Sequence, residues 1–134
     1  MIYLDANIFI YAALNEDAKG EACTRLLKRV EKGEVSGLTS YLTLEEVAWV
    51  ISKRAGKEAA VKACSDMLSI QNLRFVPVDS EISWFFLELM KSHGLRPSDA
   101  IHAASAISHS VKEFVSEDAD FDKVKEIKRT TPWT

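Results

Sequence analysis

The sequence has few of the residues that build disulfide frameworks, zinc sites or flexible linkers. It contains only two cysteines, Cys23 and Cys64, and neither has a second Cys or a His at metal-ligand spacing, so we expect two buried, reduced thiols. The three prolines are isolated, and there is no repeat or low-complexity tract. The chain is therefore predicted to fold as a single domain over residues 1–134.

Long apolar runs are also absent. The longest ones, such as residues 8–14 and 84–90, are much shorter than the roughly 20 residues that a bilayer span needs. The N-terminal residues lack the basic, apolar and small-residue regions of a secretory signal. These absences predict a cytoplasmic protein that has no membrane partner.

An excess of basic residues is missing as well, since the formal net charge is −3. An acidic chain argues at first sight against a nucleic-acid partner, because phosphate backbones attract basic surfaces. The apolar fraction of 47% and the charged fraction of 28% are typical of a folded globular protein.

Apolar patterns of helical and strand type alternate along the whole chain. The predicted strands cover residues 2–4, 35–39, 73–77, 113–116 and 127–131. The predicted helices cover residues 7–14, 18–31, 43–55, 57–70, 80–93 and 97–108. Strands separated by helices long enough for crossovers indicate a three-layer α/β/α sandwich with a mainly parallel central sheet.

Capping residues define two of the helix starts. Thr43 is a good N-cap, and Glu46 follows it at capping-box spacing. Asp79 or Ser80 can cap the later helix that Gly94 is expected to end.

Four acidic residues fall just beyond predicted strands or at helix starts that follow them: Asp5, Glu46, Asp99 and Asp118. Each has an ordinary explanation by itself, as a helix cap, a first-turn acid or a solvated turn residue. Ligands of parallel α/β sheets bind beyond the carboxyl ends of the strands, so all four map to one edge. Because clustered carboxylates repel unless cations or protons offset them, we predict a metal site there.

Oxygen ligands without His or Cys suit Mg²⁺ or Mn²⁺, which are held by a few carboxylates and by phosphate oxygens of the substrate. One ion, or two ions that activate the water and stabilise the leaving oxygen, would support phosphodiester cleavage. Leaving the four acids out of the count changes the formal charge from −3 to +1, so the acidic composition argues only weakly against RNA.

The segment around Asp118, Asp120 and Asp122 is the most acidic of the chain and invites a calcium-loop interpretation. An EF-hand loop needs Gly at its sixth position and an acid at its twelfth, where this chain has Lys123 and Arg129. We therefore reject the EF-hand and keep Asp120 and Asp122 as candidate auxiliary metal ligands.

Four segments together resemble the PIN-domain nucleases, and specifically the toxin-type (VapC-like) ribonucleases of toxin–antitoxin pairs. They are Ile2-Tyr3-Leu4-Asp5-Ala6-Asn7, Thr39-Ser40-Tyr41-Leu42-Thr43-Leu44-Glu45-Glu46-Val47, Pro97-Ser98-Asp99-Ala100-Ile101-His102-Ala103-Ala104 and Val115-Ser116-Glu117-Asp118-Ala119-Asp120-Phe121. Each motif alone is weak, whereas the four in this order are specific and span nearly the whole chain.

By this resemblance, four acids match the catalytic quartet that coordinates Mg²⁺ or Mn²⁺, and three residues match supporting polar positions. The acids are Asp5, Glu46, Asp99 and Asp118, and the supporting residues are Asn7, Ser40 and Ser116. Glu45 is the rival of Glu46, but the family acid directly precedes an aliphatic residue and lies six positions beyond the serine, as Glu46 does.

The resemblance also implies a function and partners. PIN-domain nucleases have a parallel-sheet sandwich fold and usually hydrolyse RNA endonucleolytically. Their toxin members form homodimers and are neutralised by a small antitoxin. We therefore expect an RNA substrate, an antitoxin partner and a homodimer.

Other polar and aromatic residues near these motifs have more open roles. Arg96 is a candidate contact for an RNA phosphate, although a surface arginine at a helix start is the alternative. We expect His102 to be a packing or supporting residue, because metal-activated water needs no histidine base. Phe9, Tyr11 and Trp49 are candidates for the core or a dimer interface.

Two further functions remain as alternatives within the same pattern of residues. Phosphotransfer through an aspartyl nucleophile at Asp5 resembles haloacid-dehalogenase chemistry, but that chemistry needs a second acid where this chain has Asn7. A PIN-like module that binds RNA or protein without cleaving is the non-enzymatic alternative. A stand-alone RNA-processing nuclease is the alternative to a toxin.

Overall fold

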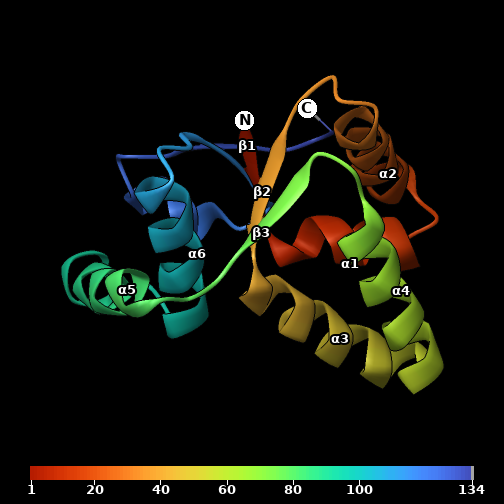
Figure 1. The fold of residues 1–134 in the computed structure, drawn as a ribbon, viewed down its shortest axis with the longest axis horizontal. Coiled ribbons are helices and arrows are strands. Elements are labelled where there is room, and N and C mark those ends of the chain that lie inside the picture. Colours follow the sequence, from red (N-terminus) through yellow and green to blue (C-terminus); the bar gives the residue numbers. More distant parts are fainter. Residues whose placement is uncertain (134) are drawn as a thin grey trace.

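The computed structural model describes residues 1–133 and has a five-stranded sheet at its centre (Figure 1). The strands are β1 (Ile2–Leu4), β2 (Gly37–Ser40), β3 (Leu73–Val76), β4 (Glu113–Val115) and β5 (Lys128–Thr130). Their order is β3-β2-β1-β4-β5, and every neighbouring pair is parallel. The predicted parallel sheet is confirmed, and it is parallel throughout.

Helices cover both faces of this sheet (Figure 1). They are α1 (Ala6–Leu14), α2 (Ala18–Glu31), α3 (Tyr41–Ala55), α4 (Lys57–Ser69), α5 (Ser80–His93), α6 (Pro97–Ser108) and the 3₁₀-helix η1 (Ala119–Lys123). The first four α-helices lie on one face, and α5 and α6 lie on the other. This arrangement is the three-layer α/β/α sandwich that the sequence predicts. None of the described helices combines the length and the apolar character that crossing a bilayer requires.

The central strand β1 shows why the sheet needs both layers. Tyr3 packs into the core formed with α5 and α6, whereas Ile2 and Leu4 pack into the core formed with α1 to α4. All three side chains are buried, as expected of a parallel strand with helices on both faces. In the second core Cys23 is buried and Cys64 is half-buried, and both thiols are free.

The start of α3 differs from the prediction. Its N-cap is Ser40, whose Oγ accepts a hydrogen bond from the Leu42 amide at 3.1 Å. Thr43 lies inside the helix with a buried side chain, and its hydroxyl pairs with that of Thr39 at 2.7 Å. The predicted capping box of Thr43 and Glu46 is therefore wrong, because a contact with strand β2 takes the threonine hydroxyl into the core.

The start and end of α5 agree with the prediction. Asp79 Oδ1 accepts a hydrogen bond from the Ile82 amide at 3.0 Å, and Gly94 ends the helix in the left-handed conformation with φ of 65°.

The strand order creates a switch point at the middle of the sheet. From β1 the chain proceeds to β2 and β3 on one side and later returns to β4 on the other side of β1. In open parallel sheets, ligands bind beyond the carboxyl ends of the strands at such a point. Asp5 directly follows β1, and Ser116 directly follows β4.

Candidate metal centre

Asp5 lies where β1 ends and α1 begins. Its amide donates to the Val115 carbonyl at 3.1 Å, which continues the pairing between β1 and β4 for one more residue. Its Oδ1 accepts from the Ala6 amide at 2.8 Å and caps α1. The side chain is 9% exposed, so the fold itself holds a buried carboxylate at the switch point.

Two of the predicted supporting residues orient this carboxylate. Ser116 Oγ donates to Asp5 Oδ2 at 2.7 Å, and Asn7 Nδ2 donates to Ser116 Oγ at 3.2 Å and to Asp5 Oδ2 at 3.4 Å. Ser116 Oγ also accepts from the Asp118 amide at 3.0 Å. This network joins the carboxyl ends of β1 and β4. Ser40, the third supporting residue, instead caps α3.

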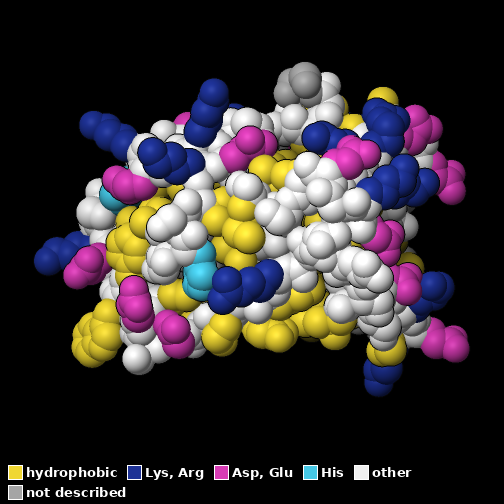
Figure 2. All heavy atoms as spheres, turned by 45° about the horizontal axis from the view of Figure 1, so that its top comes forward, with side chains coloured by type: hydrophobic (Ala, Val, Ile, Leu, Met, Phe, Trp, Pro, Cys, Tyr) yellow, Lys and Arg dark blue, Asp and Glu magenta, His cyan; other side chains and the backbone are white. Residues whose placement is uncertain are grey.

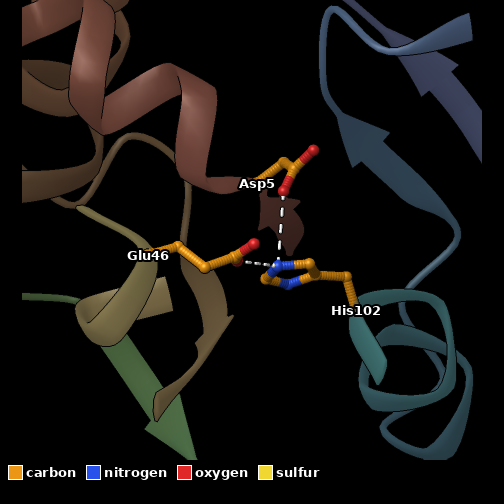
Figure 3. A group of neighbouring side chains, drawn as sticks. All are labelled: Asp5, Glu46 and His102. Carbon is orange, nitrogen blue, oxygen red and sulfur yellow. Dashed lines mark hydrogen bonds and ion pairs between the residues drawn. The ribbon is translucent and has the colours of Figure 1, made fainter. Parts of the chain in front are cut away.

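Glu46 reaches the same edge from α3 and meets a histidine there. Figure 3 shows Asp5, Glu46 and His102 pointing toward one another from three different elements. Their candidate ligand atoms lie within 4.8 Å of one another. His102 Nε2 is 2.5 Å from Glu46 Oε1 and 3.5 Å from Asp5 Oδ1. Glu45, the rival acid, is exposed, whereas Glu46 is half-buried.

A second acidic group consists of Asp99, Asp118 and Asp120, whose carboxylate oxygens also lie within 4.8 Å of one another. Asp118 caps η1 by accepting from the Asp120 amide at 2.9 Å. Asp122 belongs to neither group among residues 1–133. Its carboxylate accepts from Arg129 Nε at 2.9 Å and from Arg129 Nη2 at 3.1 Å.

Helix α6 connects the two groups, because Asp99 and His102 are three residues apart and lie on one helical face. Burial raises the pKa of Asp99 above its usual value, and the negative charges of Asp118 and Asp5 raise it further, against the opposing effect of Arg96. Burial lowers the pKa of His102, but the charges of Asp5, Glu46 and Asp99 raise it to above the usual value overall. The four predicted acids thus share one electrostatic environment.

This environment fits a hard divalent cation. The donors are carboxylate oxygens, which Mg²⁺ and Mn²⁺ prefer. Burial is the main cause of the raised pKa of Asp99, and the charges of Asp118 and Asp5 add to it while Arg96 opposes it. A bound cation would offset that charge.

Arg96 lies at the rim of the second group. Its Nε is 3.4 Å from Asp99 Oδ2, and its side chain is 73% exposed. On the face shown in Figure 2, basic and acidic side chains are interspersed and do not form one continuous basic surface. On this face, attraction of a polyanion would depend on individual basic side chains and on cations held by the acids.

Fold and site together define a class: a parallel α/β sandwich with acids from several elements gathered beyond the carboxyl ends of its central strands. Residues 2–127 match the PIN domain, and the chain belongs to this family. No curated protein matched the sequence.

Several solved structures have the same fold. VapC20 of Mycobacterium tuberculosis, described as a sarcin-ricin loop cleaving toxin, has a TM-score of 0.77 and 21% identity, with 93% of this chain and 95% of that chain covered. VapBC2 of Rickettsia felis, bound to a DNA fragment of its promoter, has a TM-score of 0.75, 22% identity and 98% coverage of both chains. DNA-bound VapBC of Salmonella typhimurium has a TM-score of 0.74 and 18% identity, with 98% of this chain and 97% of that chain covered.

His102, expected from the sequence to be a packing or supporting residue, lies inside this site. Its side chain is 1% exposed and lies between two of the predicted acids. The available signal was its position three residues after Asp99, which places both on one face of the helix. Its other partner, Tyr3, is 99 residues away in the chain and could not be found from spacing.

Proposed function

We propose that this protein is a metal-dependent endoribonuclease that hydrolyses RNA phosphodiester bonds. The observation that carries the proposal is the approach of acids from β1, α3, α6 and the loop after β4 to one edge of the sheet. Membership of the PIN domain family and the likeness to VapC20, described as a toxin that cleaves the sarcin-ricin loop, support RNA as the substrate class.

In this proposal four acids hold Mg²⁺ or Mn²⁺, with Asp120 as an auxiliary ligand, while Asn7 and Ser116 orient the first acid. The four are Asp5, Glu46, Asp99 and Asp118. A bound ion of this kind supplies Lewis acidity toward a phosphate oxygen and lowers the pKa of water. We assign Asp122 a structural role, because its carboxylate forms an ion pair with Arg129.

The chain's own residues then bind and orient the substrate. The exposed guanidinium of Arg96 is able to leave Asp99 and hold an RNA phosphate, since exposed ion pairs stabilise only weakly. The hydrogen bonds from Ser116 and Asn7 keep the Asp5 carboxylate in one orientation. Asn7 carries an amide and cannot exchange a proton as the second acid of an aspartyl phosphotransferase does.

We further propose that the protein is the toxin of a toxin–antitoxin pair and acts in the cytoplasm. The similar VapBC structures, which contain a toxin with its antitoxin, support this assignment. An apolar groove of about 610 Å³ between α1, α2, α3 and α4, lined by Phe9, Leu27, Ile51 and Met67 among others, is a surface of suitable chemistry for the antitoxin. We also propose a homodimer, in which a second copy would cover Trp84 and Leu87, two exposed apolar side chains one turn apart on α5.

The test is cleavage of RNA by the purified protein with Mg²⁺ or Mn²⁺, in parallel with Asp5→Asn. A matched control is Asp17→Asn, which changes another N-capping aspartate, bonded to the Gly20 amide at 3.0 Å but outside the site. We expect metal-dependent cleavage that Asp5→Asn abolishes and Asp17→Asn retains. Inactivity of all three proteins would favour a module that binds RNA or protein without cleaving. If the protein cleaves RNA but no neighbouring gene encodes an antitoxin, a stand-alone processing nuclease would be favoured.

A further inference from the structure

The two ring nitrogens of His102 face different partners. Nε2 lies 2.5 Å from Glu46 Oε1 and 3.5 Å from Asp5 Oδ1 (Figure 3). Nδ1 lies 2.6 Å from the hydroxyl of Tyr3. His102 and Tyr3 are both buried, with 1% and 0% of their surface exposed.

The hydroxyl proton of Tyr3 settles which nitrogen of a neutral His102 carries the proton. A tyrosine phenol ordinarily titrates at about pH 10, so the fully buried hydroxyl of Tyr3 carries its proton at neutral pH. The Ser40 backbone amide contacts the phenol oxygen, and an amide N–H can only donate. The Thr39 hydroxyl also lies beside the phenol and gives its own proton to the Leu4 carbonyl at 2.7 Å. The 2.6 Å hydrogen bond of the phenol is to His102 Nδ1, and we assign the phenol as its donor.

A neutral imidazole that accepts at Nδ1 carries its proton on Nε2. A doubly protonated ring carries a proton there as well, so Nε2 is a donor in both states. Nε2–H therefore faces two carboxylates that come from different elements of the fold, Asp5 after β1 and Glu46 on α3. A nitrogen that holds a proton has no free electron pair for a cation.

We propose that His102 is a positioning residue, which holds the carboxylates of Glu46 and Asp5 through Nε2–H while Tyr3 fixes the ring in the required tautomer. This inference rests on the proposed function, because it assigns the carboxylates to a cation. The alternative is a mixed site in which Nε2 itself binds the metal, as the spacing of Asp5, Glu46 and His102 would allow.

The test measures Mn²⁺ affinity by electron paramagnetic resonance for wild type, Tyr3→Phe, His102→Gln and His102→Leu. Mutation of a residue that hydrogen-bonds to a metal ligand typically lowers metal affinity about 10- to 100-fold. We therefore expect the His102→Leu variant to bind Mn²⁺ at least about tenfold more weakly than the wild type. His102→Gln, which keeps an N–H donor on a side chain of similar reach, should recover much of this loss. Tyr3→Phe should also weaken binding, because the ring is then free to take the other tautomer.

Structural damage is separated from this effect by two further measurements. Tyr3→Phe keeps the stacking of its ring on Phe114, whose centroid is 4.9 Å away at an interplanar angle of 12°, and melting curves check that the variant folds. Tyr41→Phe removes a half-exposed phenol outside the site and should leave Mn²⁺ affinity unchanged. If His102→Leu does not fold, Tyr3→Phe and His102→Gln carry the comparison.

The outcomes distinguish this inference from the proposed function. Equal Mn²⁺ affinity in wild type, Tyr3→Phe and His102→Leu overturns the positioning role alone. A ¹⁴N coupling of a directly bound imidazole in the wild-type Mn²⁺ spectrum, lost in His102→Gln, makes His102 a ligand and also overturns it while supporting the metal site. Absence of Mn²⁺ binding in the wild type overturns the metal site and this inference together.

Discussion

Replacing Asp99 with Asn should have opposite consequences for the metal-free and the metal-loaded protein. The Asp99 side chain is 8% exposed, and its carboxylate lies within 4.8 Å of the candidate ligand atoms of Asp118 and Asp120. Burial and like charge therefore make the ionised Asp99 unfavourable in the metal-free fold, in agreement with its raised pKa. The ionised carboxylate becomes favourable when a cation is bound beside it.

The magnitudes follow from these contacts. At 4.8 Å and an effective dielectric constant of about 20, two unit charges repel by about 3.5 kcal/mol before solvent screening. The attraction that Asp99→Asn removes is the 3.4 Å pair with the exposed Arg96, and such a pair contributes about 0–1 kcal/mol. Asp118 is half-buried and Asp120 is exposed, so solvent screening reduces this repulsion to about 1 kcal/mol. The metal-free variant should therefore melt at the wild-type temperature or up to about 4 °C above it.

With the ion at about 100 times its Kd, the wild type should gain about 2.7 kcal/mol, or about 10 °C for a chain of this length. If the variant binds about a hundredfold more weakly, its gain at the same concentration falls to about 0.4 kcal/mol, or less than about 2 °C. The assay is thermal unfolding in EDTA and in Mn²⁺, with Asp66→Asn, which breaks an exposed pair with Lys62, as the control. A variant that melts several degrees lower in EDTA, or that keeps the full Mn²⁺ shift, would refute the reasoning.

Three more predictions concern pH, the choice of acid and substrate binding. Because the pKa values of Asp99 and His102 are raised above their ordinary values of 3.8 and 6.5, the stability that they contribute is complete below those values and is lost as pH rises through the folded pKa. Urea unfolding in EDTA should therefore show stability falling as pH rises above about 6.5, and a rise there would contradict this. Glu46→Gln should lower Mn²⁺ affinity and the cleavage rate at least about tenfold. Glu45→Gln changes the exposed neighbouring acid and should behave as wild type. Equal effects of the two substitutions in a Mn²⁺ titration and an RNase assay would count against the assignment of Glu46. Arg96→Ala should raise KM for RNA and reduce the salt dependence of RNA binding while kcat changes little, because the substitution removes one phosphate contact. An unchanged KM would contradict the role of Arg96 in substrate binding.

The sequence predicts the layers and the sheet edge well, because these depend on local patterns. Alternation of apolar strands with amphipathic helices decides the sandwich, and the order of connections decides which strand ends meet. Asp5 and Asp118 could be located for this reason, since each follows a strand of the central pair.

Two positions show where a local motif is not enough, because the side chain bonds to a residue outside the motif. Thr43 has the sequence signature of a cap, but its hydroxyl bonds to Thr39 on β2, and Ser40 caps the helix. Asp122 alternates with Asp118 and Asp120 as a ligand would, yet Arg129 arrives beside it from β5. Both partners are close in sequence, four and seven residues away, but the choice between a cap or ligand role and these contacts depends on how each strand packs beside its neighbouring helix.

The position of each acid in its helix explains why a histidine accompanies only one pair of them. Asp5 and Asp118 accept hydrogen bonds from backbone amides as N-caps, and Asp99 lies in the first turn of α6, where the helix dipole favours negative charge. Glu46 lies in the second turn of α3, beyond the free amides of the helix start. Its carboxylate therefore needs a donor from elsewhere in the fold, and His102 Nε2 is that donor. Removing the imidazole should consequently displace Glu46 more than it displaces Asp5, which keeps its contacts with Ala6 and Ser116.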